Sequence, residues 1–165
     1  MGIIQAHEIE DLKDVVTMNE TPWFMYIAKK CNIWFPSSGR SVRWNTPTKY
    51  VAYYETEKSD DSNLSNENPK TITYIAKNKK YWDEITITDA RTIEELNPLF
   101  DDEAIKDKIS SWTHKFSVVL TESPIRLKSP IKIGKMRIDG LPLRTYDLPK
   151  VINAENIDEL SEWLN

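Results

Sequence analysis

The hydrophobic pattern predicts helices on both sides of a central, strand-rich region. Residues 7–17 place apolar side chains at helical spacing, with acidic residues on the opposite side. Residues 92–100 and 101–112 are also predicted helices, and the second opens with acidic residues, which favour a helix start. Residues 153–164 show another amphipathic pattern. Helices are therefore expected to pack around whatever sheet the centre of the chain forms.

Between these helices, short apolar runs and alternating residues predict strands. Residues 49–56 carry apolar or aromatic side chains on both faces, as in a central strand or a barrel strand. Residues 57–70 are polar and lack periodicity, so they are expected to form an exposed, mobile loop. The predicted strands are residues 22–30, 49–56, 71–82, 84–88, 114–123, 124–134 and 136–139.

This order of elements predicts an α+β fold, a small, curved, mostly antiparallel sheet or barrel with flanking helices. A chain of 165 residues can bury a substantial core as one domain. Its composition, 39% hydrophobic and 29% charged, is that of a globular protein rather than a disordered one. We therefore expect a single domain over residues 1–165.

Charge is distributed unevenly along the chain. The net charge is −4, yet residues 21–54 and 70–82 contain basic residues and no acidic one. Residues 124–146 contain six basic residues and a single acid, Asp139. Local potential rather than net charge steers an anionic partner, so a positive surface is expected if these blocks share a face.

Motifs for catalysis or cofactor binding are missing. The two histidines do not stand in a metal-binding arrangement, the single Cys31 favours a small buried hydrophobe, and four glycines do not form a phosphate-binding loop. We expect binding without catalysis, and no cofactor or metal. No apolar run approaches a membrane span and no signal-peptide pattern is present, so no membrane partner and a cytoplasmic location are expected.

Aromatic residues lie within or beside the basic blocks. Trp34 and Trp44 stand near turns and arginines, where a core anchor and a ligand-facing ring are equally compatible with the pattern. Trp82 follows a group of lysines that suits contacts to a phosphate backbone, although such lysines also occur at ordinary strand ends. Stacking on aromatic rings and cation–π contacts are both used to bind nucleic acid.

Residues 49–56 and 71–77 carry a family resemblance. The first ends in a Tyr-Tyr-x-Thr type of sequence, and the second, Thr-Ile-Thr-Tyr-Ile-Ala-Lys, resembles the returning strand of a small barrel, with Tyr74 where such chains often carry histidine. Residues 141–154 resemble an Arg-x-Tyr segment followed by an apolar helix. Together, residues 22–154 resemble the PUA-like superfamily, particularly its EVE and ASCH-like members.

The resemblance implies a domain that binds nucleic acid, RNA or modified DNA, and that seats a modified or flipped base in an aromatic pocket. An extruded base costs a few kcal/mol in unstacking, which an aromatic pocket can offset. The implied residues near the base are Trp34, Ser38, Trp44 and Tyr53. The implied contacts to phosphate are Arg40, Arg43, Lys77, Lys79 and Lys115. Trp82, beside the lysines of residues 77–80, is a further candidate for nucleic-acid binding.

Two alternatives stay open at the level of the sequence. A small ASCH-like nuclease or nucleotide-processing hydrolase would draw on Glu55, Glu57 and Lys77, although their spacing does not single them out. A protein-interaction module would use the aromatic stretch as an apolar contact. Oligomeric state does not follow from the sequence.

Overall fold

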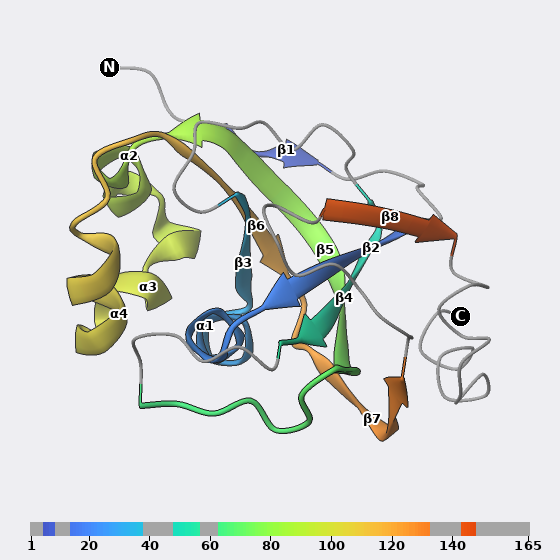
Figure 1. The fold of residues 1–165 in the computed structure, drawn as a ribbon. Helices are drawn as coiled ribbons and strands as arrows, with labels where there is room; N and C mark the ends of the chain where they lie inside the picture. The colour runs from blue at the N-terminus through green and yellow to red at the C-terminus, as the bar shows by residue number, and fades with distance from the viewer. Residues whose placement is uncertain (1–4, 9–13, 38–47, 57–62, 133–142, 148–165) are drawn as a thin grey trace.

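The computed structural model describes residues 5–8, 14–37, 48–56, 63–132 and 143–147, and their strands form one eight-stranded sheet (Figure 1). All the strand pairs are antiparallel except β2–β4. The predicted α+β fold with a mostly antiparallel sheet is therefore confirmed. Along the sheet the order is β3 (Ile33–Ser37), β6 (Phe116–Thr121), β5 (Thr71–Ile85), β4 (Tyr50–Glu55), β2 (Asp14–Glu20) and β8 (Leu143–Asp147).

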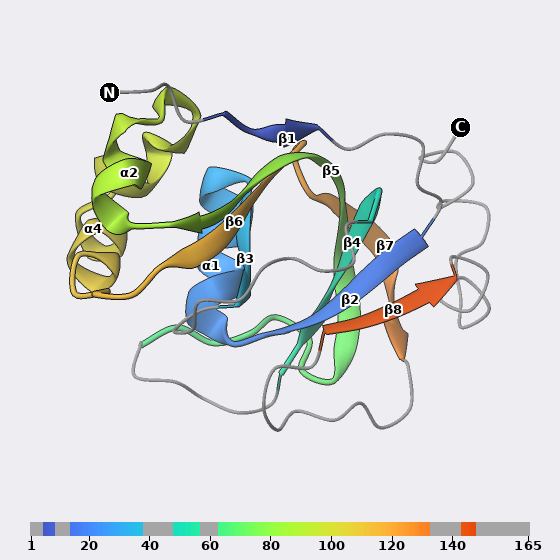
Figure 2. The same ribbon diagram turned by 90° about the horizontal axis from the view of Figure 1, so that it is seen from above.

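Strand β5 organises the sheet because it changes partners along its length. Its first part pairs with β4 and with β7 (Ile125–Lys132), and its second part pairs with β6 and with β1 (His7–Glu8). Figure 2 shows the resulting curvature, with β7 and β8 at one end of the molecule and the helices α2 (Ile87–Thr92) and α4 (Glu103–Ile109) at the other. The 15 residues of β5 thus connect two halves of the structure.

Helix α1 (Pro22–Cys31) replaces a predicted strand, so the prediction for residues 22–30 was wrong. Trp23 and Ile27 face one hydrophobic core, whereas Met25 and Ala28 face another. A helix buried on several sides lacks the polar face that identifies an amphipathic helix, so its short apolar run resembled a buried strand. Pro22 fits the first turn of a helix, where no backbone N–H is required.

The predicted helix over residues 7–17 was also wrong, because residues 14–20 form strand β2. Val15, Val16 and Thr17 are β-branched and favour a strand once a partner is available. The partner is β4, which pairs with β2 in parallel and lies more than 30 residues away in the sequence. This long-range pairing overrides the local helical spacing.

The region after β5 is helical, as predicted for residues 92–100 and 101–112, but residues 92–100 do not form one continuous helix. The predicted strand over residues 84–88 ends at Ile85, because Thr86 begins α2 with a capping box. In that box Asp89 N donates to Thr86 Oγ1 at 3.1 Å, and Thr86 N donates to the Asp89 carboxylate at 3.0 Å. The elements are α2 (Ile87–Thr92), the 3₁₀ turn η1 (Glu94–Leu96), α3 (Pro98–Asp101) and α4 (Glu103–Ile109).

The remaining strand predictions are confirmed where the structure describes them. Strands β4, β5, β6 and β7 occupy the predicted segments 49–56, 71–82, 114–123 and 124–134. Residues 63–70 contain no helix or strand, as expected for a loop. Strand β8 was not predicted as a strand. The predicted strand 136–139 and helix 153–164 lie outside the described residues.

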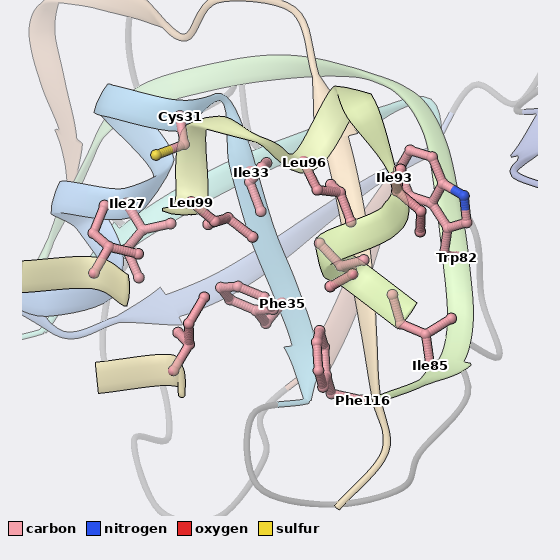
Figure 3. Packing of buried hydrophobic residues seen from close by; sticks show 14 of the residues in the cluster. Ile27, Cys31, Ile33, Phe35, Trp82, Ile85, Ile93, Leu96, Leu99 and Phe116 are labelled. Atoms are coloured by element: carbon pink, nitrogen blue, oxygen red, sulfur yellow. The ribbon is translucent and has the colours of Figure 1, made fainter. Parts of the chain in front are cut away.

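Two hydrophobic clusters lie among the residues that the structure describes. The first, which we call the helical core, joins α1, β3, β5 and β6 to the helices α2 to α4 (Figure 3). The second, the barrel core, lies where α1 packs on the curved sheet, and it consists of Met18, Met25, Ala28, Trp34, Val51, Tyr53, Ala76 and Val119. Helix α1 therefore contributes side chains to both cores.

A polar contact fixes α1 to the start of α4. The Tyr26 hydroxyl and the Lys30 ammonium donate to the Asp102 carboxylate at 2.6 and 2.7 Å, and Asp102 also accepts from the backbone N–H of Ile105 at 3.0 Å. These hydrogen bonds, that of Lys30 first, hold the pKa of Asp102 well below its usual range. The carboxylate is therefore ionised at neutral pH and caps α4 while binding α1.

Candidate nucleic-acid interface

Trp34, predicted either as a core anchor or as a ligand-facing ring, lies in the barrel core with 1% of its surface exposed. Its indole N–H donates to Asn78 Oδ1 at 2.9 Å. Asn78 in turn donates from Nδ2 to the carbonyl oxygen of Thr48 at 3.0 Å. Through Asn78, Trp34 thus anchors β3 to β5 and to Thr48, two residues before β4.

Removing the side-chain amide of Asn78 should destabilise the protein. We expect Asn78→Ala to lower the free energy of unfolding by about 2–4 kcal/mol, because it leaves two buried polar partners unsatisfied, the Trp34 indole N–H and the Thr48 carbonyl. Urea unfolding followed by tryptophan fluorescence measures the change. Asn63→Ala, at an exposed position, is the control and should change the free energy little. Equal effects of the two substitutions would contradict the role of Asn78.

Lys77 meets Tyr50 in the pairing of β5 with β4, and Lys49 Nζ lies 5.7 Å from the centre of the Tyr50 ring. We call these three residues the Lys49–Lys77 cluster. Burial raises the pKa of Tyr50, and the positive charge of Lys77 acts in the opposite direction, whereas Glu122 reinforces the rise. Neither lysine forms an ion pair with a carboxylate in the part of the chain that the structure describes. Two cations are therefore available on one side of a largely buried tyrosine.

The other predicted contacts divide into three groups. Lys79 is exposed and lies two positions beyond Lys77 on β5. Lys115 is exposed at the far end of β6, whose Phe116 pairs with Ile85 while Thr121 pairs with Asn78. Five residues of strand, roughly 17 Å, separate these ends. Ser38, Arg40, Arg43 and Trp44 lie outside the described residues, in the segment that ends just before Thr48.

Trp82 belongs to a different region from Trp34. It is 1% exposed and packs in the helical core beside Ile85 and Ile93, as Figure 3 shows. Lys80 Nζ lies 6.0 Å from the centre of its ring. The sequence grouped the two tryptophans by their basic neighbours, but Trp34 of β3 packs in the barrel core and Trp82 of β5 packs in the helical core.

The carboxylate–lysine cluster of the nuclease alternative is not assembled by the described residues. Glu55 pairs with Thr71 at one end of β4, whereas Lys77 pairs with Tyr50 at the other end. The antiparallel register therefore separates the two side chains by the length of the strand, roughly 17 Å. Glu57 lies outside the described residues.

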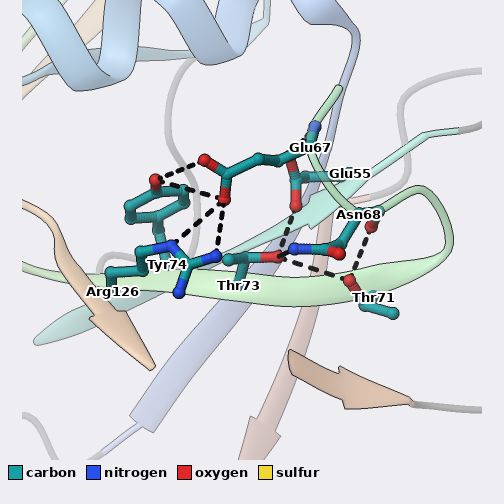
Figure 4. Close-up of polar contacts among 7 residues, drawn as sticks. All are labelled: Glu55, Glu67, Asn68, Thr71, Thr73, Tyr74 and Arg126. Atoms are coloured by element: carbon teal, nitrogen blue, oxygen red, sulfur yellow. Dashed lines mark hydrogen bonds and ion pairs between the residues drawn. The ribbon is translucent and has the colours of Figure 1, made fainter. Parts of the chain in front are cut away.

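A polar group at the ends of β4 and β5, which the sequence did not single out, binds residues 66–68 to the sheet (Figure 4). The buried Glu55 carboxylate accepts hydrogen bonds from the Thr73 hydroxyl and from the backbone N–H of Glu67, the latter at 3.0 Å. The Glu67 carboxylate pairs with Arg126 Nη2 at 3.1 Å and accepts from the Tyr74 hydroxyl at 3.3 Å. The contacts of Glu55 and Glu67 thus attach the loop to the sheet.

Glu20 and Tyr53 are two further polar residues inside the protein. Glu20 is 4% exposed and Tyr53 is fully buried. Burial raises the pKa of Glu20 to about 8. Burial also raises the pKa of Tyr53, the nearby Glu20 charge adds to the rise, and Thr121 acts against it. A carboxyl group with such a pKa is mostly protonated at neutral pH.

Other candidate chemistry has little support in the described part of the chain. No group of three or more His, Cys, Asp and Glu residues there is arranged to hold a metal ion. Cys31 is buried, as predicted, and burial raises the pKa of its thiol to about 11, which disfavours the reactive thiolate. None of the described helices has the length and apolar character needed to span a bilayer.

Two solved structures resemble this fold over most of its length. One is the crystal structure of ASCH from Zymomonas mobilis, with a TM-score of 0.44 and 12% identity over 93% of this chain and 95% of that chain. The other is a tyrosine-to-phenylalanine mutant of the same protein, with a TM-score of 0.43 and 11% identity over 91% and 96%. ASCH is one of the groups named by the sequence resemblance. No family model and no curated protein matches the chain.

Proposed function

We propose that this chain is a nucleic-acid-binding domain whose contact with the phosphate backbone includes the Lys49–Lys77 cluster. The observation that carries the proposal is the pair of lysines beside Tyr50, neither of which forms an ion pair within the described residues. The protein has a net charge of −4, and unpaired neighbouring cations keep a positive potential that attracts an anionic chain.

The position of the cluster in the sequence supports the same partner. Lys49 follows the segment that contains Arg40, Arg43 and Trp44, two forked cations and a ring suited to phosphate and base contacts. Lys79 continues the basic stretch along β5. A polyanion that follows this stretch would meet cations from β5 and from the segment between β3 and β4.

The finer part of the proposal is that a modified or flipped base is received where α1 packs on the sheet. Tyr53 and Trp34 supply aromatic surface in the barrel core. Lys29 Nζ lies 5.2 Å from the centre of the Tyr74 ring, at the edge of the same core. Stacking of a base on such rings stabilises binding by roughly 1–3 kcal/mol, enough to offset much of the cost of unstacking.

Fluorescence anisotropy with single-stranded RNA, unmodified DNA and methylated DNA, each at two salt concentrations, tests this function. We expect binding that weakens as salt increases, because phosphate contacts release counterions. The double substitution of Lys49→Ala and Lys77→Ala should weaken binding and reduce the dependence of log K on log salt by about 1.4 for single strands.

The matched control removes two lysines elsewhere. Lys106→Ala with Lys108→Ala on α4 gives the same change in net charge. We expect this control to retain the salt dependence of the unsubstituted protein. Salt-independent binding, or equal losses in the two double variants, would overturn the assignment of the interface. Absence of binding to all three nucleic acids would overturn the function.

A further inference from the structure

Arg126 and Tyr74 hold the carboxylate of Glu67 at the surface of the sheet (Figure 4). Arg126 donates to Glu67 Oε2 from Nε at 3.2 Å and from Nη2 at 3.1 Å, and the Tyr74 hydroxyl donates to Oε1 at 3.3 Å. Lys29 Nζ lies 5.2 Å from the centre of the Tyr74 ring and forms no ion pair with a described carboxylate. Of the two cations beside Tyr74, the structure thus shows a carboxylate partner for Arg126 alone among the residues it describes.

Regular elements of the fold position these three donors. Arg126 of β7 stands directly opposite Tyr74 of β5 in the strand pairing, so their side chains are neighbours on the sheet. Lys29 lies in the last turn of α1, the helix that packs on the barrel core. The arrangement of the donors therefore depends on the sheet and on α1 rather than on the loop that carries Glu67.

Glu67 is fixed through its backbone more firmly than through its side chain. Its N–H donates to the buried Glu55 carboxylate at 3.0 Å, and the preceding Asn66 donates from Nδ2 to two backbone carbonyls, each at 3.0 Å. The carboxylate, in contrast, belongs to a side chain that is 41% exposed, and its partner Arg126 is 51% exposed. Rotation of the Glu67 side chain can therefore free the donors while the loop stays attached to the sheet.

The chemistry of the donors suits an anion with more oxygens than a carboxylate. A guanidinium fork binds phosphate as well as carboxylate with two hydrogen bonds, and a lysine adds a point charge. A phosphate group on an ester carries a charge of about −1.5 to −2 and three acceptor oxygens, whereas a carboxylate has one charge and two oxygens. A phosphate can thus engage Lys29 in addition to the two groups that hold Glu67.

We propose that Arg126, Tyr74 and Lys29 form a binding site for a phosphate group, and that the Glu67 carboxylate competes with that phosphate. The Arg126 fork binds the phosphate oxygens, the Tyr74 hydroxyl donates to one of them, and Lys29 neutralises the remaining charge. The Glu67 side chain turns into solvent when the phosphate enters. A phosphate on a free small molecule and a phosphate in a nucleic-acid backbone present the same oxygens to this site.

The site is separate from the Lys49–Lys77 cluster. Tyr74 pairs with Tyr53, and both rings pack on the side of the sheet that α1 covers. Lys77 follows Tyr74 by three positions on β5, and side chains alternate between the two faces of a strand, so Lys77 and its partner Tyr50 belong to the opposite face. The inference therefore goes beyond the proposed function and does not depend on it.

Titration with inorganic phosphate at constant ionic strength, followed through the backbone amide NMR resonances of Glu67 and Tyr74, tests the site. Glu67→Gln should tighten phosphate binding by up to about fivefold, because it removes the competition of an exposed ion pair. Arg126→Gln should weaken binding by about tenfold, the loss expected for hydrogen bonds between charged groups, and Lys29→Ala should weaken it less. Glu67→Gln should bring no gain when Arg126→Gln is also present.

The matched control is Glu95→Gln, which removes the same charge and an ion pair with Lys80 elsewhere on the surface. It should leave phosphate affinity unchanged. Thermal unfolding midpoints close to that of the unsubstituted protein would show that each variant is folded, as expected for exposed positions. Equal affinities of Glu67→Gln and Glu95→Gln, no phosphate binding by Glu67→Gln, or unchanged affinity in Arg126→Gln or Lys29→Ala would overturn the inference.

An abasic oligonucleotide distinguishes the two sources of the phosphate. A gain from Glu67→Gln that appears with this strand as well, and persists with Lys49→Ala and Lys77→Ala, would identify a nucleic-acid backbone as a ligand of the site. A gain with inorganic phosphate alone would identify a free phosphate-bearing molecule. Failure of the phosphate titration would leave the proposed function standing, because that function is tested separately at Lys49 and Lys77.

Discussion

Replacing Glu20 with glutamine should stabilise the protein by up to about 5 kcal/mol above pH 8 and have little effect at pH 4. The pKa of this carboxyl group is about 8 in the folded protein and 4.5 in its ordinary environment. Between these values the folded state holds a proton that the unfolded state has released. Stability therefore falls as pH rises from about 4.5 to about 8, and glutamine removes that loss.

Urea unfolding of both proteins at several pH values between 4 and 9 measures this effect. The difference in free energy of unfolding should grow with pH and level off above pH 8. Glu94→Gln, on the exposed side of the turn η1, is the control and should show no comparable growth. A difference that stays constant between pH 4 and pH 9 would contradict a protonated Glu20 in the folded protein.

Replacing Glu55 should destabilise the protein. We expect Glu55→Gln to cost about 1–3 kcal/mol, because one of its two donors, the Thr73 hydroxyl or the Glu67 N–H, loses its acceptor. Glu55→Ala should cost more, since it also leaves a cavity at a fully buried position. The contacts of residues 66–68 with the sheet should weaken in both variants.

Chemical unfolding gives the free energies, and limited proteolysis reports whether residues 63–70 become easier to cleave. Glu67→Gln is the matched control, because its carboxylate forms an exposed ion pair with Arg126 that is worth at most about 1 kcal/mol. If the two glutamine variants had the same stability, the buried acceptor of Glu55 would not be what holds the loop.

The sequence predicted the strands that form the centre of the sheet because their patterns are unambiguous. All six residues of β4 are buried, which matches the apolar character of both its faces. In strand β6, Phe116 and Val118 both pack in the helical core, as their alternate positions predicted, and the residues next to them are buried as well. The residues of these segments favour a strand and pair with other strands in the folded protein, so local preference and tertiary structure agree.

Helix α1 was mispredicted as a strand and strand β2 as a helix, and both errors have the same physical origin. Helix α1 is buried on two sides by cores that exist only after folding, so its sequence shows no polar stripe. Strand β2 has a helix-like spacing, but it pairs with β4 and β8, which are distant in sequence. In both elements the deciding contacts are long-range, and a local pattern does not record them.

The candidate site was predictable only in its basic part. Lys77 and Lys79 were found from charge and neighbouring rings, and both lie where a backbone contact is feasible. The burial of Glu20 was not predicted, because it is one of the acidic residues that precede the predicted strand 22–30, and acidic side chains are mostly exposed. Its burial depends on β4 and on Asn66, which join it from other parts of the chain.

The pairing of β2 with β8 has a consequence for how the chain folds during its synthesis. Strand β8 begins at residue 143, and its partner β2 ends at residue 20, so the ribosome must complete most of the chain before they meet. Until then one edge of β2 has unpaired backbone groups, which can associate with other nascent chains. A nascent chain in which β8 has not yet been synthesised is thus exposed to aggregation, whatever the stability of the finished sheet.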